Sequence, residues 1–177
     1  MDKVIHFYKN AEDEYLWCGQ TYYDFIDYAF DKADYFMLVY VNYYGKGYSA
    51  QQKYFKEKLK KFKVKSRSNP SWPGTPATFC PDTTYKIVFY KTDSAAKPIL
   101  KEVDRLNKWS NPTFPEDLAF FIGNKCWFWS VGHENLAEIS RADEKDTEFI
   151  NSKGLNSSSI ITYVEECYFQ DLDESLE

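Results

Sequence analysis

Two side chains that could together perform nucleophilic catalysis, Cys126 and His133, lie seven residues apart in the aromatic stretch 115–139. A thiolate and an imidazole must come within hydrogen-bond reach, about 3 Å, to act as a pair. Seven residues of extended strand span roughly 23 Å, and Gly132 lies too close to His133 for a local bend to close that gap. The spacing therefore predicts that Cys126 is a buried strand residue that packs as a small apolar side chain.

The remaining catalytic candidates are His133 and its neighbour Glu134. In a hydrolase or transferase, His133 would act as a general base oriented by a carboxylate. That role requires the imidazole to line a pocket with a carboxylate or thiol within hydrogen-bond reach. We keep this enzyme as an alternative prediction.

Metal-binding motifs are missing from the sequence. The pair His133-Glu134 does not begin an HExxH motif, because Ala137 occupies the last position. The local acidic cluster near the start of the chain lacks the spacing of an EF-hand loop; it consists of Glu12, Asp13 and Glu14. The four cysteines are 62, 46 and 41 residues apart, too far for a close ligand pair; they are Cys18, Cys80, Cys126 and Cys167. We predict neither a metal nor a cofactor.

A β-hairpin is the element that must position these residues. Residues 118–122 and 125–131 read as two strands, and Gly123-Asn124 is a two-residue turn of the kind that accepts positive φ. Strict alternation along the second strand would place Trp127 and Trp129 on one face and Cys126 and Phe128 on the other. The orientation of the two tryptophans then separates a structural hairpin from a recognition surface.

Other periodic segments alternate between helix and strand. Apolar spacing and end signals predict helices at 22–34, 50–62, 98–109 and 143–151. They predict strands at 4–8, 35–44, 85–90, 134–140 and 158–164. This order favours a single α+β domain over 1–177, with three to four helices packed on a mixed or mostly antiparallel sheet.

Residues 66–84 form a Pro-rich loop that contains four of the seven prolines. Proline lacks an amide donor and restricts the residue before it, so neither a helix nor a central strand can run through this segment. Loops of this length are commonly functional or disordered. Trp72 indicates that this one packs onto the domain at some points.

Composition favours binding over catalysis. The net charge is -5, and aromatic residues make up 19% of the chain. Tyrosine and tryptophan are enriched at protein interfaces, and an acidic surface favours a basic partner. We therefore predict a non-enzymatic protein-binding module, such as an immunity or inhibitor protein that masks a basic partner. The predicted contact residues are Trp72, Trp127, Trp129, Asp24, Asp27 and Asp31.

The segment 53–67 is strongly basic. It holds eight basic residues and one acid, so it carries +7, while the rest of the chain carries -12. A solvated helix face explains this pattern, as does pairing with the acidic C-terminal tail, 165–177, within one chain or between two copies. The third explanation is a nucleic-acid accessory protein with a polyanion-binding helix, although the net charge makes nucleic acid an unexpected partner. The residues that would serve it are Lys53, Lys56, Lys60, Lys61 and Lys63.

The start of the chain lacks a basic segment followed by an apolar one, so we expect no signal peptide. The longest apolar run, 35–41, is too short to cross a bilayer. We expect a soluble cytoplasmic protein, a monomer or a homodimer, with another protein as its partner and no membrane association.

Overall fold

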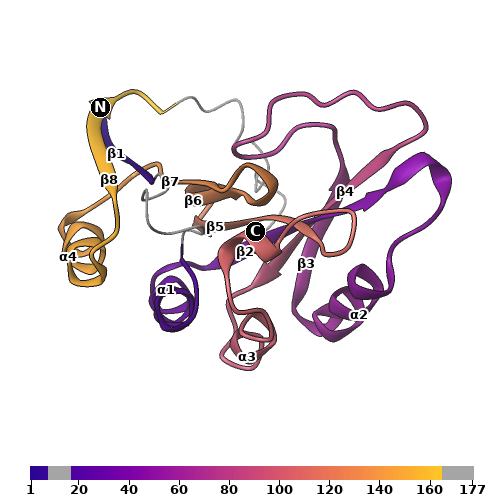
Figure 1. Ribbon diagram of the computed structural model, residues 1–177, viewed down its shortest axis with the longest axis horizontal. Coiled ribbons are helices and arrows are strands. Elements are labelled where there is room, and N and C mark those ends of the chain that lie inside the picture. The colour runs from indigo at the N-terminus through magenta and orange to yellow at the C-terminus, as the bar shows by residue number, and fades with distance from the viewer. Residues whose placement is uncertain (8–16, 165–177) are drawn as a thin grey trace.

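The computed structural model describes residues 1–7 and 17–164. One antiparallel sheet of eight strands, in the order β3-β4-β2-β5-β6-β7-β1-β8, carries four helices. Figure 1 shows this sheet edge-on with the helices along one side of it. The prediction of an α+β fold with a mostly antiparallel sheet is confirmed. The acidic trio Glu12, Asp13 and Glu14, together with Cys167 and the tail 165–177, lies outside the described residues.

The strands and helices have the following bounds. The strands are β1 Asp2–Phe7, β2 Tyr35–Asn42, β3 Lys63–Ser68, β4 Thr84–Lys91, β5 Glu116–Ile122, β6 Lys125–Val131, β7 Leu136–Ile139 and β8 Ser157–Thr162. The helices are α1 Gln20–Lys32, α2 Ala50–Lys58, α3 Lys97–Leu100 and α4 Glu144–Lys153. Short 3-10 turns follow β2, α2 and β6, and a fourth lies at Leu106–Lys108.

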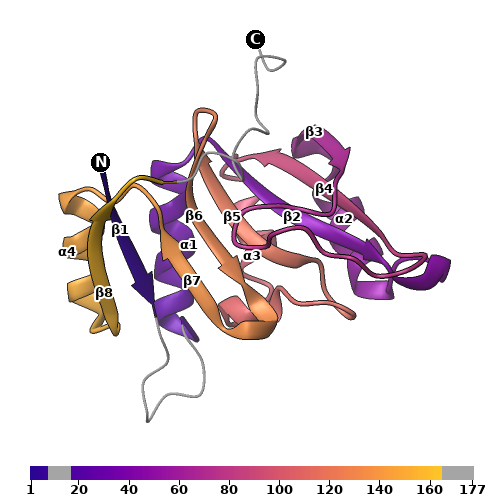
Figure 2. The ribbon, with the colours of Figure 1, turned by 90° about the horizontal axis from the view of Figure 1, so that it is seen from above.

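The central strand β2 is buried on both faces, as its unbroken run of apolar residues predicts. Phe36, Leu38 and Tyr40 face the helices, whereas Met37 and Val39 face the opposite side. On that opposite side, hereafter the open face, Trp72 packs from the Pro-rich loop onto the sheet. Seen from above in Figure 2, this loop crosses β2 and β4, while β7, β1 and β8 have no helix over them.

Helix α2 begins where its sequence indicates. The Ser49 side chain accepts a hydrogen bond from the Gln52 amide, as an N-cap does. The buried Gln52 amide group bonds both the N–H and the C=O of Val41, which fixes the helix to the end of β2. The α-helix ends at Lys58, a 3-10 turn continues to Phe62, the predicted end, and the chain then forms β3. We predicted no strand there, because the lysine-rich pattern resembles a solvated helix face.

A β-bulge in β6 overturns the predicted alternation of its side chains. Phe128 is opposite Phe120 but Cys126 is opposite Phe121, so Trp127 has no partner in β5. Trp127 and Phe128 both pack on the helix side. Cys126 and Trp129 belong to the open face. The two tryptophans therefore lie on opposite faces of the sheet.

Helix α3 is much shorter than the predicted helix 98–109. After Leu100 the chain turns, and residues 104–106 hydrogen-bond to the segment before α1. The amide of Gly19 donates to the carbonyl of Asp104, and the amide of Leu106 donates to that of Trp17. These tertiary bonds replace the helical ones. No helix within residues 1–7 and 17–164 is both long and apolar enough to cross a bilayer.

Candidate functional site

Cys126 and His133 do not form a catalytic pair. Cys126 is fully buried at the start of β6, where burial raises the pKa of its thiol well above the usual range. Its sulfur lies 3.3 Å from the carbonyl oxygen of Phe128. His133 is half exposed in the 3-10 turn that follows the other end of β6. The predicted role of Cys126 as a small core residue agrees with this placement.

His133 has part of the geometry that a hydrolase or transferase, our alternative prediction, would require. Its Nδ1 lies 3.3 Å from Glu116 and its Nε2 lies 3.5 Å from Glu134. Its side chain does not line any of the three pockets described for residues 1–7 and 17–164. The imidazole therefore has a carboxylate to orient it but lies outside these three pockets.

Asp117 is a buried clamp between the hairpin and the Pro-rich loop. Its Oδ2 accepts hydrogen bonds from Trp72 Nε1 at 2.8 Å and Thr75 Oγ1 at 3.1 Å, and its Oδ1 accepts one from the Gly132 amide at 2.9 Å. Burial, followed by the charge of Glu116, raises the pKa of Asp117 to about 7. Burial also raises the pKa of Glu116.

The same carboxylates form, with His133, a group whose ligand atoms lie within 4.8 Å of one another. Three oxygen or nitrogen ligands could hold a cation, but both oxygens of Asp117 already face N–H or O–H donors. A cation bound to Oδ2 would compete with the two donors from the Pro-rich loop, Trp72 and Thr75. We therefore interpret this cluster as structural.

The predicted recognition face is not assembled on one surface. Trp72 and Trp127 are each 1% exposed, so neither offers contact area to a partner in this conformation. The indole of Trp127 donates to Asp146, at the start of α4, at 3.2 Å. This buried position corrects the prediction that both tryptophans lie at the surface.

The acidic residues of α1 are paired with lysines from other elements. Asp27 lies 2.6 Å from Lys101, and Lys97 lies 3.5 Å from both Asp27 and Asp31. Asp24 pairs with Lys153 of α4, and this hydrogen bond lowers the pKa of Asp24. These pairs neutralise much of the acidic face that the sequence predicts.

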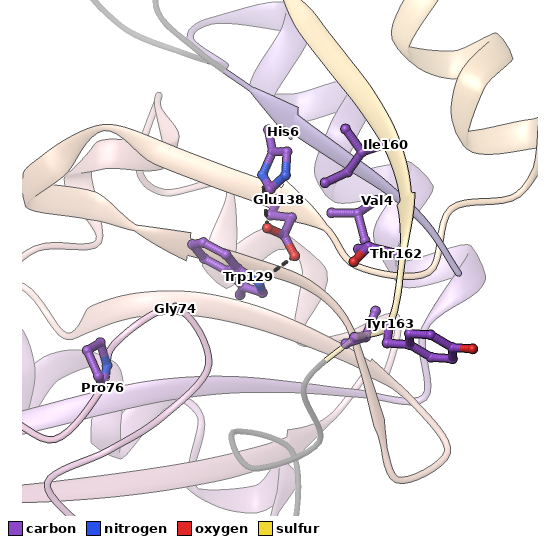
Figure 3. A pocket seen from close by; sticks show the side chains of 10 residues that line it. Val4, His6, Gly74, Pro76, Trp129, Glu138, Ile160, Thr162 and Tyr163 are labelled. Atoms are coloured by element: carbon purple, nitrogen blue, oxygen red, sulfur yellow. Dashed lines mark hydrogen bonds and ion pairs between the residues drawn. The ribbon is translucent and has the colours of Figure 1, made fainter. Parts of the chain in front are cut away.

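Trp129 is the predicted contact residue that borders a pocket. A row of side chains crosses the open face from β6 to β8: Trp129 is opposite Glu138, Glu138 is opposite His6, and His6 is opposite Ser158. The Trp129 indole donates to Glu138 Oε1 at 3.2 Å, and His6 Nδ1 lies 3.0 Å from Glu138 Oε2. Figure 3 shows these three side chains converging in the pocket.

This pocket, hereafter the Trp129 pocket, has a volume of about 270 Å³. Val4 and Ile160, which pair across β1 and β8, form part of its apolar wall, and Gly74 and Pro76 bring the tip of the Pro-rich loop to its rim. Gly74 permits this approach because a Cβ there would lie 2.3 Å from the Trp129 ring. The Trp129 pocket thus offers apolar walls and one Glu–His pair.

The outer edge of β8 adjoins the Trp129 pocket. Within the described residues no strand pairs with this edge. Ile160 is 48% exposed, Ile161 63% and Tyr163 78%. Ile160 and Tyr163 line the Trp129 pocket, whereas Ile161 is opposite Lys3 and lies on the helix side of the sheet.

A second pocket lies between α2 and the strands β3 and β4, at the other end of the sheet. Lys53, Lys56 and Lys60 line it from the α2 segment, Lys63 from β3 and Lys86 from β4. Its volume is about 560 Å³. We call it the lysine pocket. Lys61, also predicted for a polyanion site, is not among its lining residues and lies over the ring of Phe62 instead.

Sequence reasoning missed His6, Glu138 and Lys86. Each reaches its pocket only through strand pairing: β1 joins β7 and β8, and β4 joins β3. An isolated histidine or glutamate carries no signal of a partner 132 positions away. Comparison with known protein families, curated proteins and solved structures found no match for this chain.

Proposed function

We propose that the protein is a binding module that holds another protein over the β8 end of its sheet. The observation that carries this proposal is the combination, on one surface, of an apolar pocket and an uncovered strand edge. Trp129, Ile160 and Tyr163 line the pocket, and Ile161 is exposed on the other face of the same strand. A partner could add a strand to β8 through main-chain hydrogen bonds and place a side chain in the pocket.

Charge complements this shape. Glu138 supplies a carboxylate in the pocket, and its own side chain is largely buried. A basic side chain of a partner would compete with His6 for that carboxylate. An inhibitor or immunity protein that masks a basic target, the class that the acidic composition favours, would use such a surface.

The test is a pull-down with cross-linking from cells of the native host, using matched variants. Ile160→Asp places a charge at the pocket wall, whereas Ile122→Asp places the same charge at the end of the β5–β6 hairpin, where the parent residue is also exposed. We expect one stoichiometric protein with the parent chain and with Ile122→Asp, and its loss with Ile160→Asp. Recovery of no such protein, or equal recovery by both variants, would refute the proposal.

A further inference from the structure

The lysine pocket concentrates positive charge in one place. Five ammonium groups and one carboxylate, Glu57, line a volume of about 560 Å³. Among the described residues, only Lys60 of the five has a carboxylate partner, Glu57 at 3.7 Å. Like charges held this close repel one another, so the pocket is stabilised by an anion that enters it.

The lysines of this pocket come from two different parts of the fold. Lys53, Lys56 and Lys60 recur at helical spacing along the edge of the α2 segment, while Phe55 and Leu59 point into the core. Lys63 and Lys86 come from the adjacent strands β3 and β4. The helix and the two strands therefore enclose a pocket instead of presenting a flat basic stripe.

Tyrosines form the apolar part of the pocket. Tyr48 and Tyr90 line it, and the Tyr90 hydroxyl lies 2.8 Å from that of Tyr40 in the core. The Lys56 ammonium lies 4.4 Å from the centre of the Tyr48 ring. Partial burial, followed by the charges of Lys86 and Lys63, lowers the pKa of Lys56. Lys56 thus lies within the field of the other lysines and gains from a bound anion.

We propose that the lysine pocket binds a compact ligand that carries several phosphate groups. Lysine ammonium groups bind phosphate as mobile point charges, and the volume lies within the range of small-molecule sites. A long nucleic acid fits less well, because the chain outside 53–67 carries -12 and would repel its flanking phosphates. This site is separate from the Trp129 pocket, so the proposal does not depend on the proposed protein-binding function.

The test is calorimetric titration of the full chain with inorganic triphosphate at low and at physiological salt. We expect saturable one-to-one binding that weakens as salt rises. Lys56→Gln/Lys86→Gln should weaken binding at least tenfold. Lys53→Gln/Lys63→Gln, at two exposed positions, should do the same without a change in packing.

The matched control is Lys46→Gln/Lys145→Gln, which removes the same charge from two exposed lysines outside the pocket. It should leave triphosphate affinity within about twofold of the parent value. Failure of the parent chain to bind, or an equal loss in the control, would overturn the proposal. Equal affinity for citrate would overturn the assignment to phosphate, and tighter binding of single-stranded RNA through the same lysines would overturn the assignment to a compact ligand.

Discussion

The two outer edges of the sheet have opposite chemistry. β3 reads KVKSRS and carries Lys63, Lys65 and Arg67, whereas β8 reads SSSIIT and carries no charge. Charged side chains on an edge strand discourage pairing with another chain, and an uncharged edge with exposed isoleucines lacks this protection. This difference is consistent with the two proposals, anion binding at the β3 end and protein binding at the β8 end.

The largest expected effect tests what holds the Pro-rich loop, whose tip lies at the rim of the Trp129 pocket. Asp117→Ala removes the acceptor for Trp72 Nε1, Thr75 Oγ1 and the Gly132 amide. Each buried donor left without a partner costs about 1–3 kcal/mol, so we expect the free energy of unfolding to fall by about 3 kcal/mol. Urea denaturation measures it. The exposed Asp31→Ala should change stability by less than about 0.5 kcal/mol, and triphosphate binding should survive in both folded variants.

A smaller loss is expected when the loop is pushed away from the Trp129 pocket. Gly74→Ala would place a Cβ 2.3 Å from the Trp129 ring at a residue with φ of 82°. Overpacking and the left-handed backbone should together cost about 2 kcal/mol and shift tryptophan fluorescence. Gly123→Ala has φ of 55° and nothing within 4 Å of the added Cβ. An equal loss in both variants would show that the contact with Trp129 is unimportant.

The Asp117 clamp should also respond to pH. Because its folded pKa is raised to about 7, the folded state binds more protons than the unfolded state between about pH 4 and pH 7. The contribution of Asp117 to stability is therefore complete below pH 4 and is lost as the pH rises through 7, with a slope of at most about 1.4 kcal/mol per pH unit.

The variant Asp117→Asn isolates the pH-dependent contribution of Asp117 to the free energy of unfolding. The asparagine stays neutral at every pH, so the stability difference between the parent chain and the variant should shrink as the pH rises from 5 to 8. Denaturation curves across that range measure the difference. A difference that is constant or grows with pH would contradict the raised pKa.

The smallest expected effect on stability tests the edges themselves. Ile161→Lys charges the β8 edge at an exposed position, and Lys63→Ile removes a charge from the exposed β3 edge. Each should change the free energy of unfolding by less than about 0.5 kcal/mol. Light scattering during heating should show less aggregation with Ile161→Lys and more with Lys63→Ile. More aggregation with Ile161→Lys than with Lys63→Ile would contradict the proposed difference between the two edges.

Local sequence signals predicted most of the helices and strands but not which elements lie beside one another in the fold. The β5–β6 hairpin follows from Gly123-Asn124, and the core helix stripes follow from apolar spacing. The bulge at Trp127 left no such signal, because the sequence alternates as a regular strand would and only packing against β5 selects the extra residue. β3 was missed because its lysines interact with solvent and with other elements.

The candidate sites were less predictable than the fold. Trp129 and four of the five pocket lysines could be named from composition and charge. His6, Glu138 and Lys86 could not, since long-range strand order places them. Trp72 and Trp127 were assigned to a surface because tryptophan is common at interfaces, whereas here their N–H groups bind the buried carboxylates of Asp117 and Asp146.

The position of β1 sets the order of events during synthesis. This strand lies between β7 and β8, and Phe7 is opposite Ala137, 130 positions later. At about 5–20 residues per second, a ribosome needs roughly ten seconds to make the intervening chain. β1 must therefore wait for β7 and β8, and this sheet closes only after both have been made. Until then Ile5 and Phe7 stay available to chaperones.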